Sequence, residues 1–331
     1  MAKYHIYGLG AALVDTEIEV SDGDLAALQV EKGVMTLVDE PRQHELVRHL
    51  EGHLVHSRRA SGGSACNSII AASYFGARTY YSCKVADDDN GSFFMGDLKN
   101  AGVDADFDGA RESGITGKCL VMITPDAERS MNTFLGISGS LSVAELDEQA
   151  LADSDYLYLE GYLVSSETGR AAAIRARQCA EANGVKTAFS LSDPAMVEFF
   201  REGLQQMIGE GVDLLFCNEA EAMSWSGSDS LEQAIEALQQ VARCVVVTLG
   251  SKGALIAEGE QRIEIAPTPV TAVDTNGAGD MFAGAFLYGV TAGHSLAQAG
   301  ALASAAAARV VSSFGPRLEP EAHSALLSVL K

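Results

Sequence analysis

The sequence has few positive charges and no long apolar run. It contains 23 Lys and Arg against 45 Asp and Glu, for a formal net charge of −22. So acidic a chain does not favour nucleic acid or an anionic membrane surface as its partner. No stretch approaches the ~18 consecutive apolar residues of a membrane-spanning helix, and residues 1–5 lead into no apolar signal-peptide region. We therefore expect a cytoplasmic protein with small-molecule ligands.

Cysteine and proline are also scarce. Seven prolines against 33 glycines indicate tight turns rather than disordered linkers. With 47% apolar residues, 331 residues suffice for one large α/β domain or two units. Several cysteines lie in apolar stretches and none form a CxxC pair, so we expect buried free thiols in a reducing compartment. These cysteines are Cys66, Cys83, Cys119, Cys179, Cys217 and Cys244.

Two common nucleotide-binding signatures are missing. The early turn GLG at residues 8–10 lacks the third glycine of a dinucleotide fingerprint, because position 13 is Leu13. No Gly-Lys-Ser/Thr P-loop occurs anywhere in the sequence. These absences argue against a Rossmann dehydrogenase and a P-loop kinase.

From about residue 143, short apolar strands alternate with helices. This rhythm predicts a parallel sheet covered on both faces. Strands are expected at 155–159, 187–190, 214–217 and 245–248, and helices near 165–183, 195–207, 219–225, 231–241, 280–291, 296–311 and 320–330. Earlier, we expect a buried strand at 5–14, helices at 41–50 and 90–100 and a strand at 79–85. A helix from Asn67 should stop at Gly76.

A second, smaller sheet is expected beside this core. Residues 118–124 and 130–135 flank a turn-like PDAE and predict a hairpin. Strands near Ile18 and Leu37 alternate polar and apolar residues, as strands with one wet face do. Together these segments predict a sheet separate from the main core.

Polar and small residues follow several core strands: Gly161, Asn218 and Gly250. Ligands of parallel sheets bind outside the carboxyl ends of the strands. We therefore expect these strand ends to converge on a site. Asp15 is interpreted as the end of an apolar strand from Leu9 to Val14, where a carboxylate suits sugar hydroxyls or simply faces solvent.

The stretch DTNGAGD at residues 274–280 is the most informative motif. Glycines before an apolar helix let backbone N–H groups approach an anion, and the helix start adds positive potential. Asp280 then lies at the edge of an anion site. From this stretch alone, capping of the helix and handling of a proton both stay open.

Other motifs have a purely structural interpretation as well as a functional one. TLGSKG at 248–253 suits nucleotide phosphates, with Lys252 offsetting their charge, but taken alone is more typical of an ordinary turn. Asn218 and Glu221 share one face of a first helical turn and suit either hydrated Mg²⁺ or a helix cap. Ser64 and Asn67, after a glycine pair, suit sugar hydroxyls or a helix cap.

In this order, the motifs resemble the ribokinase/PfkB family of carbohydrate and nucleoside kinases over essentially the whole chain. They are SGGSACN at 61–67, NEAE at 218–221, TLGSKG at 248–253 and DTNGAGD at 274–280. The GLGAALVD stretch at 8–15 and ERS at 128–130 are most similar to the adenosine-kinase branch. The resemblance implies one three-layer α/β domain over 1–331, with a mainly parallel central sheet and a discontinuous β lid from about 15–40 and 115–136.

The resemblance also implies an ATP-dependent kinase and assigns its residues. Asp280 would be the catalytic base, and Gly277, Ala278 and Gly279, with Asn276, would form the anion hole. The acceptor would be held by Asp15, Gly63, Ser64 and Asn67, with Arg129 on the transferring phosphoryl group. ATP would contact Asn218, Thr248, Gly250, Lys252 and Gly253, and Mg²⁺ would be held through water by Asn218 and Glu221. A K⁺ site is implied at the carbonyls of Asp274, Asn276, Val310, Ser313 and Gly315.

Two departures from the adenosine kinases bear on the acceptor. Those enzymes carry Asn where this chain has Ala11, and the aromatic residue that stacks on adenine corresponds to Leu163, beside Tyr162. Adenosine, inosine, guanosine, ribose, fructose and 2-keto-3-deoxygluconate therefore all stay open as acceptors.

A non-catalytic nucleotide or sugar sensor is the alternative class of protein, although an intact Asp280 favours a kinase. Either a monomer or a homodimer is compatible with the sequence.

Overall fold

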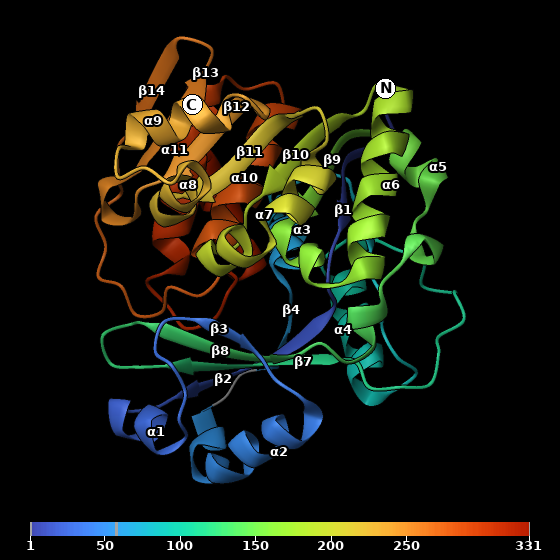
Figure 1. The fold of residues 1–331 in the computed structure, drawn as a ribbon, viewed down its shortest axis with the longest axis vertical. Helices are drawn as coiled ribbons and strands as arrows, with labels where there is room; N and C mark the ends of the chain where they lie inside the picture. The colour runs from blue at the N-terminus through green and yellow to red at the C-terminus, as the bar shows by residue number, and fades with distance from the viewer. Residues whose placement is uncertain (1, 57–58, 331) are drawn as a thin grey trace.

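The computed structural model describes residues 2–56 and 59–330 and builds them around a nine-stranded sheet (Figure 1). The strand order is β14-β13-β12-β11-β10-β9-β1-β5-β6, parallel from β6 to β12 and antiparallel at β13 and β14. These strands are β1 Tyr4–Leu9, β5 Thr79–Ser82, β6 Val103–Asp104, β9 Ser154–Glu160, β10 Lys186–Ser190, β11 Val212–Asn218, β12 Ala242–Thr248, β13 Ala254–Glu258 and β14 Gln261–Ile265. The predicted three-layer α/β fold with a mainly parallel sheet is confirmed.

Helices cover both faces of this sheet. One face packs against α5 Glu148–Ala152, α6 Glu167–Asn183, α7 Pro194–Ile208, α8 Glu219–Ser226 and α9 Leu231–Leu238. The other packs against α3 Ser64–Phe75, α4 Asp89–Asn100, α10 Ala278–Thr291, α11 Leu296–Val310 and α12 Pro320–Leu326. Neighbouring strand residues alternate between the two cores: Leu214 and Phe216 enter one, Leu215 and Cys217 the other. Apolar runs without alternation are therefore what this sheet requires.

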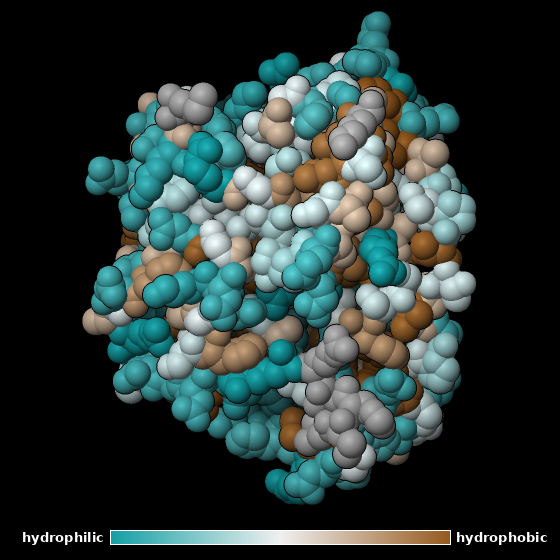
Figure 2. All heavy atoms as spheres, turned by 180° about the vertical axis from the view of Figure 1, so that it is seen from behind, coloured by the Kyte–Doolittle hydropathy of each residue, from teal (hydrophilic) through white to brown (hydrophobic). Residues whose placement is uncertain are grey.

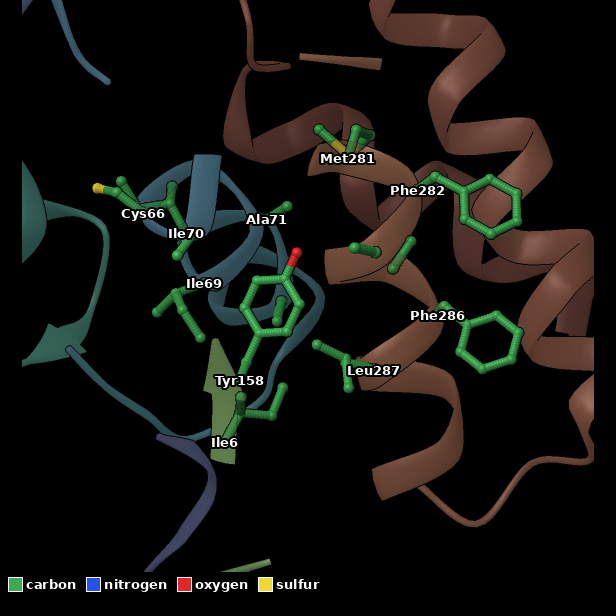
Figure 3. Close-up of a cluster of buried hydrophobic side chains, with 14 of the residues drawn as sticks. Ile6, Cys66, Ile69, Ile70, Ala71, Tyr158, Met281, Phe282, Phe286 and Leu287 are labelled. Atoms are coloured by element: carbon green, nitrogen blue, oxygen red, sulfur yellow. The ribbon is translucent and has the colours of Figure 1, made fainter. Parts of the chain in front are cut away.

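The core between α3 and α10 positions two segments that lie far apart in sequence. Ile69 and Ile70 from α3 lie beside Tyr158 of β9, with Phe282, Phe286 and Leu287 of α10 on the other side (Figure 3). A Cβ added at Gly284 would collide with the carbonyl oxygen of Ser68, so the two helices approach closely because α10 has glycine there. This packing sets the helix starts at Ser64 and Ala278 side by side.

The second sheet has five strands in the order β3-β8-β7-β2-β4 and lies below the main sheet in Figure 1. Its strands are β2 Leu13–Glu19, β3 Met35–Leu37, β4 Arg59–Gly62, β7 Gly117–Ile123 and β8 Arg129–Phe134. Its outer face packs against α1 Asp22–Ala27 and α2 Glu40–His49 through Leu25 and Leu46. The expected small sheet is thus present, and we refer to these five strands as the lid sheet.

One predicted strand was wrong in its extent. Residues 5–14 do not form one strand, because β1 ends at Leu9 and β2 starts at Leu13 in the lid sheet. Asp15 therefore lies inside a lid strand and not at the end of a core strand. Between Leu9 and Leu13 the chain passes from the core sheet to the lid sheet. The apolar run continues through this passage because both strands are buried, so hydrophobicity gave no sign that one strand ends and another begins. The sequence analysis also missed α1, α5, β4 and β6.

None of the described helices is long and apolar enough to cross a membrane. Seen from behind, the surface is largely hydrophilic, and the hydrophobic atoms that reach it gather mainly on the right of the view (Figure 2). All six cysteines are free, as predicted, and all except the half-buried Cys83 are buried.

Candidate active site

The last residues of four adjacent core strands line one cavity of about 330 Å³. They are Glu160 of β9, Ser190 of β10, Asn218 of β11 and Thr248 of β12. The opposite wall comes from the lid sheet, through residues such as Asp15, Arg129 and Met131. The start of α3, the turn at 275–280 and the segments that follow β8 and β9 also contribute to the lining. This is the ligand position expected for a parallel sheet.

Asp280 lies in the first turn of α10, but its carboxylate is not bonded to that turn. Its Oδ1 accepts a hydrogen bond from Ser64 Oγ at 2.6 Å, and its Oδ2 accepts one from Asn67 Nδ2 at 3.2 Å. Burial raises the pKa of Asp280, while the bonds from Ser64 and Asn67 and the charge of Arg129 lower it. The carboxylate is therefore held by α3 and reaches the cavity, a geometry that suits proton transfer better than helix capping.

Two buried oxygen atoms beside Asp280 have no hydrogen-bond partner within the described protein. They are Oδ1 of Asp15 and Oδ1 of Asn67, on side chains that are 5% and 4% exposed. Both residues line the cavity. Buried oxygens without partners are costly unless a ligand or water supplies donors. This end of the cavity is thus suited to a molecule with several hydroxyl groups.

The glycine pair is required by this end of the cavity. A Cβ at Gly62 would collide with the carboxylate of Asp15, and one at Gly63 would collide with the carbonyl oxygen of Ala11. Gly63 also has φ of +99°, which favours glycine. The pair lets β4 pass against Asp15 and turn directly into α3.

Glu160 is a site residue that the sequence analysis missed. Its carboxylate accepts from the N–H of Ala11 at 2.8 Å and from the N–H of Ala65 at 2.7 Å. It thereby caps α3, whose own N-cap residue Gly63 has no side chain to do so. Burial raises the pKa of Glu160 to about 7. The strand-end rule was the available signal, since Glu160 immediately precedes Gly161.

Arg129 is the only cationic side chain among the described residues that line the cavity. Five carboxylates share that lining: Asp15, Glu128, Glu160, Glu221 and Asp280. The charge of Arg129 lowers the pKa of Asp280 and Glu221, although burial keeps both pKa values above their ordinary range. In a chain of such negative charge, Arg129 is therefore the local positive group that an anionic ligand would meet.

Asn218 and Glu221 form a helix cap, which is one of the two interpretations that their spacing allowed. Asn218 Oδ1 accepts from the N–H of Glu221 at 2.8 Å, and the N–H of Asn218 donates to Glu221 Oε2 at 3.1 Å. Burial raises the pKa of Glu221 to about 7. Both residues nevertheless line the cavity. The cap fixes a carboxylate and an amide at the cavity wall, so capping and ligand binding are compatible here.

The turn at 248–253 contributes one residue to the cavity lining. Thr248 lines it, whereas Gly250, Lys252 and Gly253 do not. Lys252 is exposed and donates to Glu219 at 3.0 Å. A Cβ at Gly253 would collide with the carbonyl oxygen of Ile265, so packing alone requires that glycine. The assignment of these three residues to ATP stays a prediction.

The turn at 274–277 is fixed from three directions. The buried carboxylate of Asp274 accepts from the N–H of Asn276 at 2.8 Å and from the N–H of Gly315 at 3.0 Å. Two lid elements also reach the turn: Asn276 Nδ2 donates to Glu17 Oε1 at 3.3 Å, and Thr275 Oγ1 donates to the carbonyl of Ala127 at 3.2 Å. The N–H of Asn276 already bonds Asp274, and the N–H of Ala278 donates to the carbonyl of Thr275 at 3.3 Å, so Gly277 and Gly279 are the better placed part of the expected anion hole. The lid sheet and the turn are thus held together in this structure.

An apolar wall lies next to the hydroxyl-binding end of the cavity. Its side chains come mainly from the lid sheet and from the segment after β9. They are Leu13, Met35, Leu37, Met131, Leu135 and Leu163. Tyr162 also lines the cavity, and its hydroxyl donates to the carbonyl of Ser192 at 3.3 Å. A ligand here meets both polar groups and hydrocarbon.

The chain is similar to known kinases over nearly its whole length. The model of the pfkB family of carbohydrate kinases matches residues 36–322. A solved structure of adenosine kinase from Sinorhizobium meliloti is 32% identical, with a TM-score of 0.93 over 99% of this chain and 100% of that one. A structure of a probable sugar kinase from Rhizobium etli CFN 42 is 31% identical, with a TM-score of 0.94 over 100% of both chains. Fructoselysine 6-kinase of Shigella flexneri is 30% identical over 77% of this chain and 91% of its own length.

Proposed function

The chain belongs to the pfkB family of carbohydrate kinases and is an ATP-dependent kinase of hydroxyl groups, and we propose that its acceptor is a nucleoside, with adenosine as the first candidate. The observation that carries this proposal is the apolar wall beside the polar, hydroxyl-binding end of the cavity. A free sugar has hydroxyls on most of its surface and would leave that wall uncovered. A base would cover it, while the ribose hydroxyls reach Asp15 and Asn67.

The arrangement supports transfer of a phosphoryl group to a primary hydroxyl. Asp280 would take the proton from that hydroxyl as its oxygen bonds to the γ-phosphorus of ATP, and the bond from this phosphorus to the β–γ bridging oxygen would break to release ADP. Ser64 and Asn67 hold the carboxylate in place before the acceptor arrives. Gly277 to Gly279 and the guanidinium of Arg129 would stabilise the charge on the transferring group.

Two groups of residues are proposed to hold the cations of the reaction. Glu221 and Asn218 supply the oxygen donors that Mg²⁺ prefers, and we assign them to Mg²⁺ through water. When bound, the metal would neutralise phosphate charge. A K⁺ ion on the carbonyls of Asp274, Asn276, Val310, Ser313 and Gly315 remains part of the proposal. Equal turnover with and without K⁺ would remove it.

An ADP-release screen tests the acceptor. The purified protein is assayed with ATP, Mg²⁺ and one of adenosine, inosine, guanosine, ribose, fructose and 2-keto-3-deoxygluconate. We expect saturable turnover with a nucleoside, and adenosine to give the highest kcat/KM. Turnover with a sugar and none with any nucleoside would contradict the proposal.

A free or derivatised sugar is the second candidate. Glu160 favours it, because a further buried carboxylate lines the cavity near the hydroxyl-binding end. The similarity to a fructoselysine 6-kinase points the same way. The screen separates the two candidates directly.

We further propose that residues 1–331 act as one cytoplasmic kinase domain. Its lid would comprise about 15–40 and 115–136, with β4 as an additional strand. Whether it works as a monomer or a homodimer is decided by light scattering at assay concentration.

A further inference from the structure

Three consecutive residues near the C-terminus contact both ends of the candidate active site. The N–H of Gly315 donates to Oδ2 of Asp274 at 3.0 Å, at the start of the anion-binding turn. The backbone of Pro316 lies against Gly277, where an added Cβ would collide with the carbonyl oxygen of Pro316. Arg317, the next residue, turns to the other side and bonds Ser61 of β4 and Asp97 of α4.

Arg317 forms a largely buried ion pair. Its Nη2 donates to Oδ2 of Asp97 in α4 at 2.8 Å and to Oγ of Ser61 at 3.3 Å. Ser61 Oγ also donates to Asp97, which closes a three-residue network. The Arg317 side chain is 12% exposed and that of Asp97 is 26% exposed. Such shielding makes this pair stronger and more dependent on both partners than an ordinary surface pair.

The network holds the strands that carry the acceptor-binding groups. Ser61 immediately precedes the glycine pair and lies opposite Val14, next to Asp15 in β2. Arg317 itself is not part of the cavity lining. It contacts the site through Ser61 on one side and through Pro316 on the other, and while burial raises the pKa of the nearby Asp15, the charge of Arg317 lowers it.

We propose that Arg317 is a positioning residue for phosphoryl transfer, whose ion pair with Asp97 fixes the acceptor-binding strands relative to the anion-binding turn. Transfer between two bound molecules requires the attacking oxygen and the phosphorus to be held close and in line. The hydroxyl is positioned by β2, β4 and α3, and the phosphate by the turn at 276–279. Residues 315–317 connect these two groups through three consecutive residues of backbone.

Kinetics of Arg317→Met test the proposal, which rests on the kinase activity of this site. Methionine keeps much of the aliphatic bulk and removes the charge and donors. We expect kcat to fall tenfold to about 100-fold, because small displacements of reacting groups have effects of this size. The KM for the acceptor should rise, while the KM for ATP should stay within about twofold, since Gly315 and Pro316 still hold the turn. Arg317→Lys should recover part of kcat, because an ammonium still pairs with Asp97 but lacks the guanidinium fork.

A double-mutant cycle adds a second readout. If Arg317 and Asp97 act as a pair, Arg317→Met with Asp97→Leu should have nearly the kcat of Arg317→Met alone.

Arg175→Met is the matched control, because it breaks an exposed pair with Glu148, outside the cavity lining, and should leave all kinetic constants unchanged. Should Arg317→Met fail to fold, Arg317→Lys and Ser61→Ala carry the same test with smaller expected changes.

The proposal is overturned if the folded variants unfold at lower temperature but keep wild-type kcat and KM, which would mark a purely structural pair. All variants are assayed with whichever acceptor the wild type phosphorylates. Turnover of a sugar in place of a nucleoside would therefore contradict the proposed acceptor and leave the Arg317 test intact.

Discussion

One carboxylate, Asp280, is the residue to which we assign the proton transfer, because it lines the cavity and is held there by α3. Both of its oxygens accept hydrogen bonds from α3 side chains, so its orientation does not depend on a bound ligand. We predict that Asp280→Asn lowers kcat by about 10²–10⁴-fold, the usual contribution of a general base. ATP should still bind, because the anion-binding backbone is unchanged. ADP release measures the first effect and calorimetric titration with Mg²⁺ and ATP the second.

Asp229→Asn is the control for this prediction. Asp229 is an exposed carboxylate that is not part of the cavity lining, so its replacement should leave kcat unchanged. Near-normal turnover by Asp280→Asn would mean that another group takes the proton.

A second carboxylate, Glu160, should make stability depend on pH. Burial raises its pKa from 4.5 to about 7, so between these values the unfolded chain loses the proton first. Ionisation then favours the unfolded state, and the contribution of Glu160 is fully present below pH 4.5 and is lost as pH rises through about 7. Relative to Glu160→Gln, the wild type should lose at most roughly 3 kcal/mol of unfolding free energy over this window.

Thermal unfolding of both proteins at pH 5 and pH 8 measures this difference. Glutamine resembles the protonated side chain, so the two melting temperatures should be close at pH 5. At pH 8 the melting temperature of the variant should be higher, relative to that of the wild type, than it is at pH 5. Glu264→Gln, at an exposed position, should show the wild-type pH dependence. Parallel pH profiles for the wild type and Glu160→Gln would show that the buried carboxylate does not control this dependence.

At the scale of elements, the junction of β4 and α3 depends on glycine for the shape of the backbone. We predict that Gly63→Ala lowers kcat/KM for the acceptor at least tenfold, because the methyl group would push against Ala11 and the positive φ disfavours alanine. The displaced backbone carries Ser64 and Asn67 with it. Steady-state kinetics with varied acceptor and then varied ATP locate the effect.

Gly96→Ala is the matched control for that substitution. Gly96 is an exposed position inside α4, and an added Cβ there meets no atom within 4 Å. Alanine should raise the unfolding free energy by about 0.5–1 kcal/mol without changing kcat/KM. Equal kinetic effects of the two alanines would indicate that the junction does not need a glycine at position 63.

The same junction shows what the sequence does and does not determine. The glycine pair, the helix to Gly76 and the DTNGAGD turn have local signals, and the end of that helix at Gly76 was correctly predicted, although it begins at Ser64 and not at Asn67. Asp15 was assigned to a core strand because the lid sheet is also buried there and continues the apolar run. Glu160 and Arg317 act through backbone or side chains 95 and 220 positions away. No local pattern marks such contacts, so only the fold reveals them.

At the scale of the whole molecule, the kinase must bind a polyanion with a strongly negative chain. The formal charge is −22, yet Arg129 is the one cation among the described residues that line the cavity. We therefore expect backbone N–H groups at the start of α10 to do much of the phosphate binding. This local attraction is short-ranged, whereas the repulsion from the rest of the surface reaches further.

Salt should separate these two contributions. The Debye length falls from about 30 Å at 0.01 M to about 10 Å at 0.1 M, so moderate salt screens the distant carboxylates more than the contacts inside the cavity. We predict that the KM for ATP falls severalfold over this range, while the KM for a neutral nucleoside acceptor stays constant. A bulky organic cation with fixed Mg²⁺ is used, so that a K⁺ effect does not enter. A KM for ATP that rises with salt would mean that attraction by Arg129 and the helix start extends beyond the cavity and outweighs the net charge of the chain.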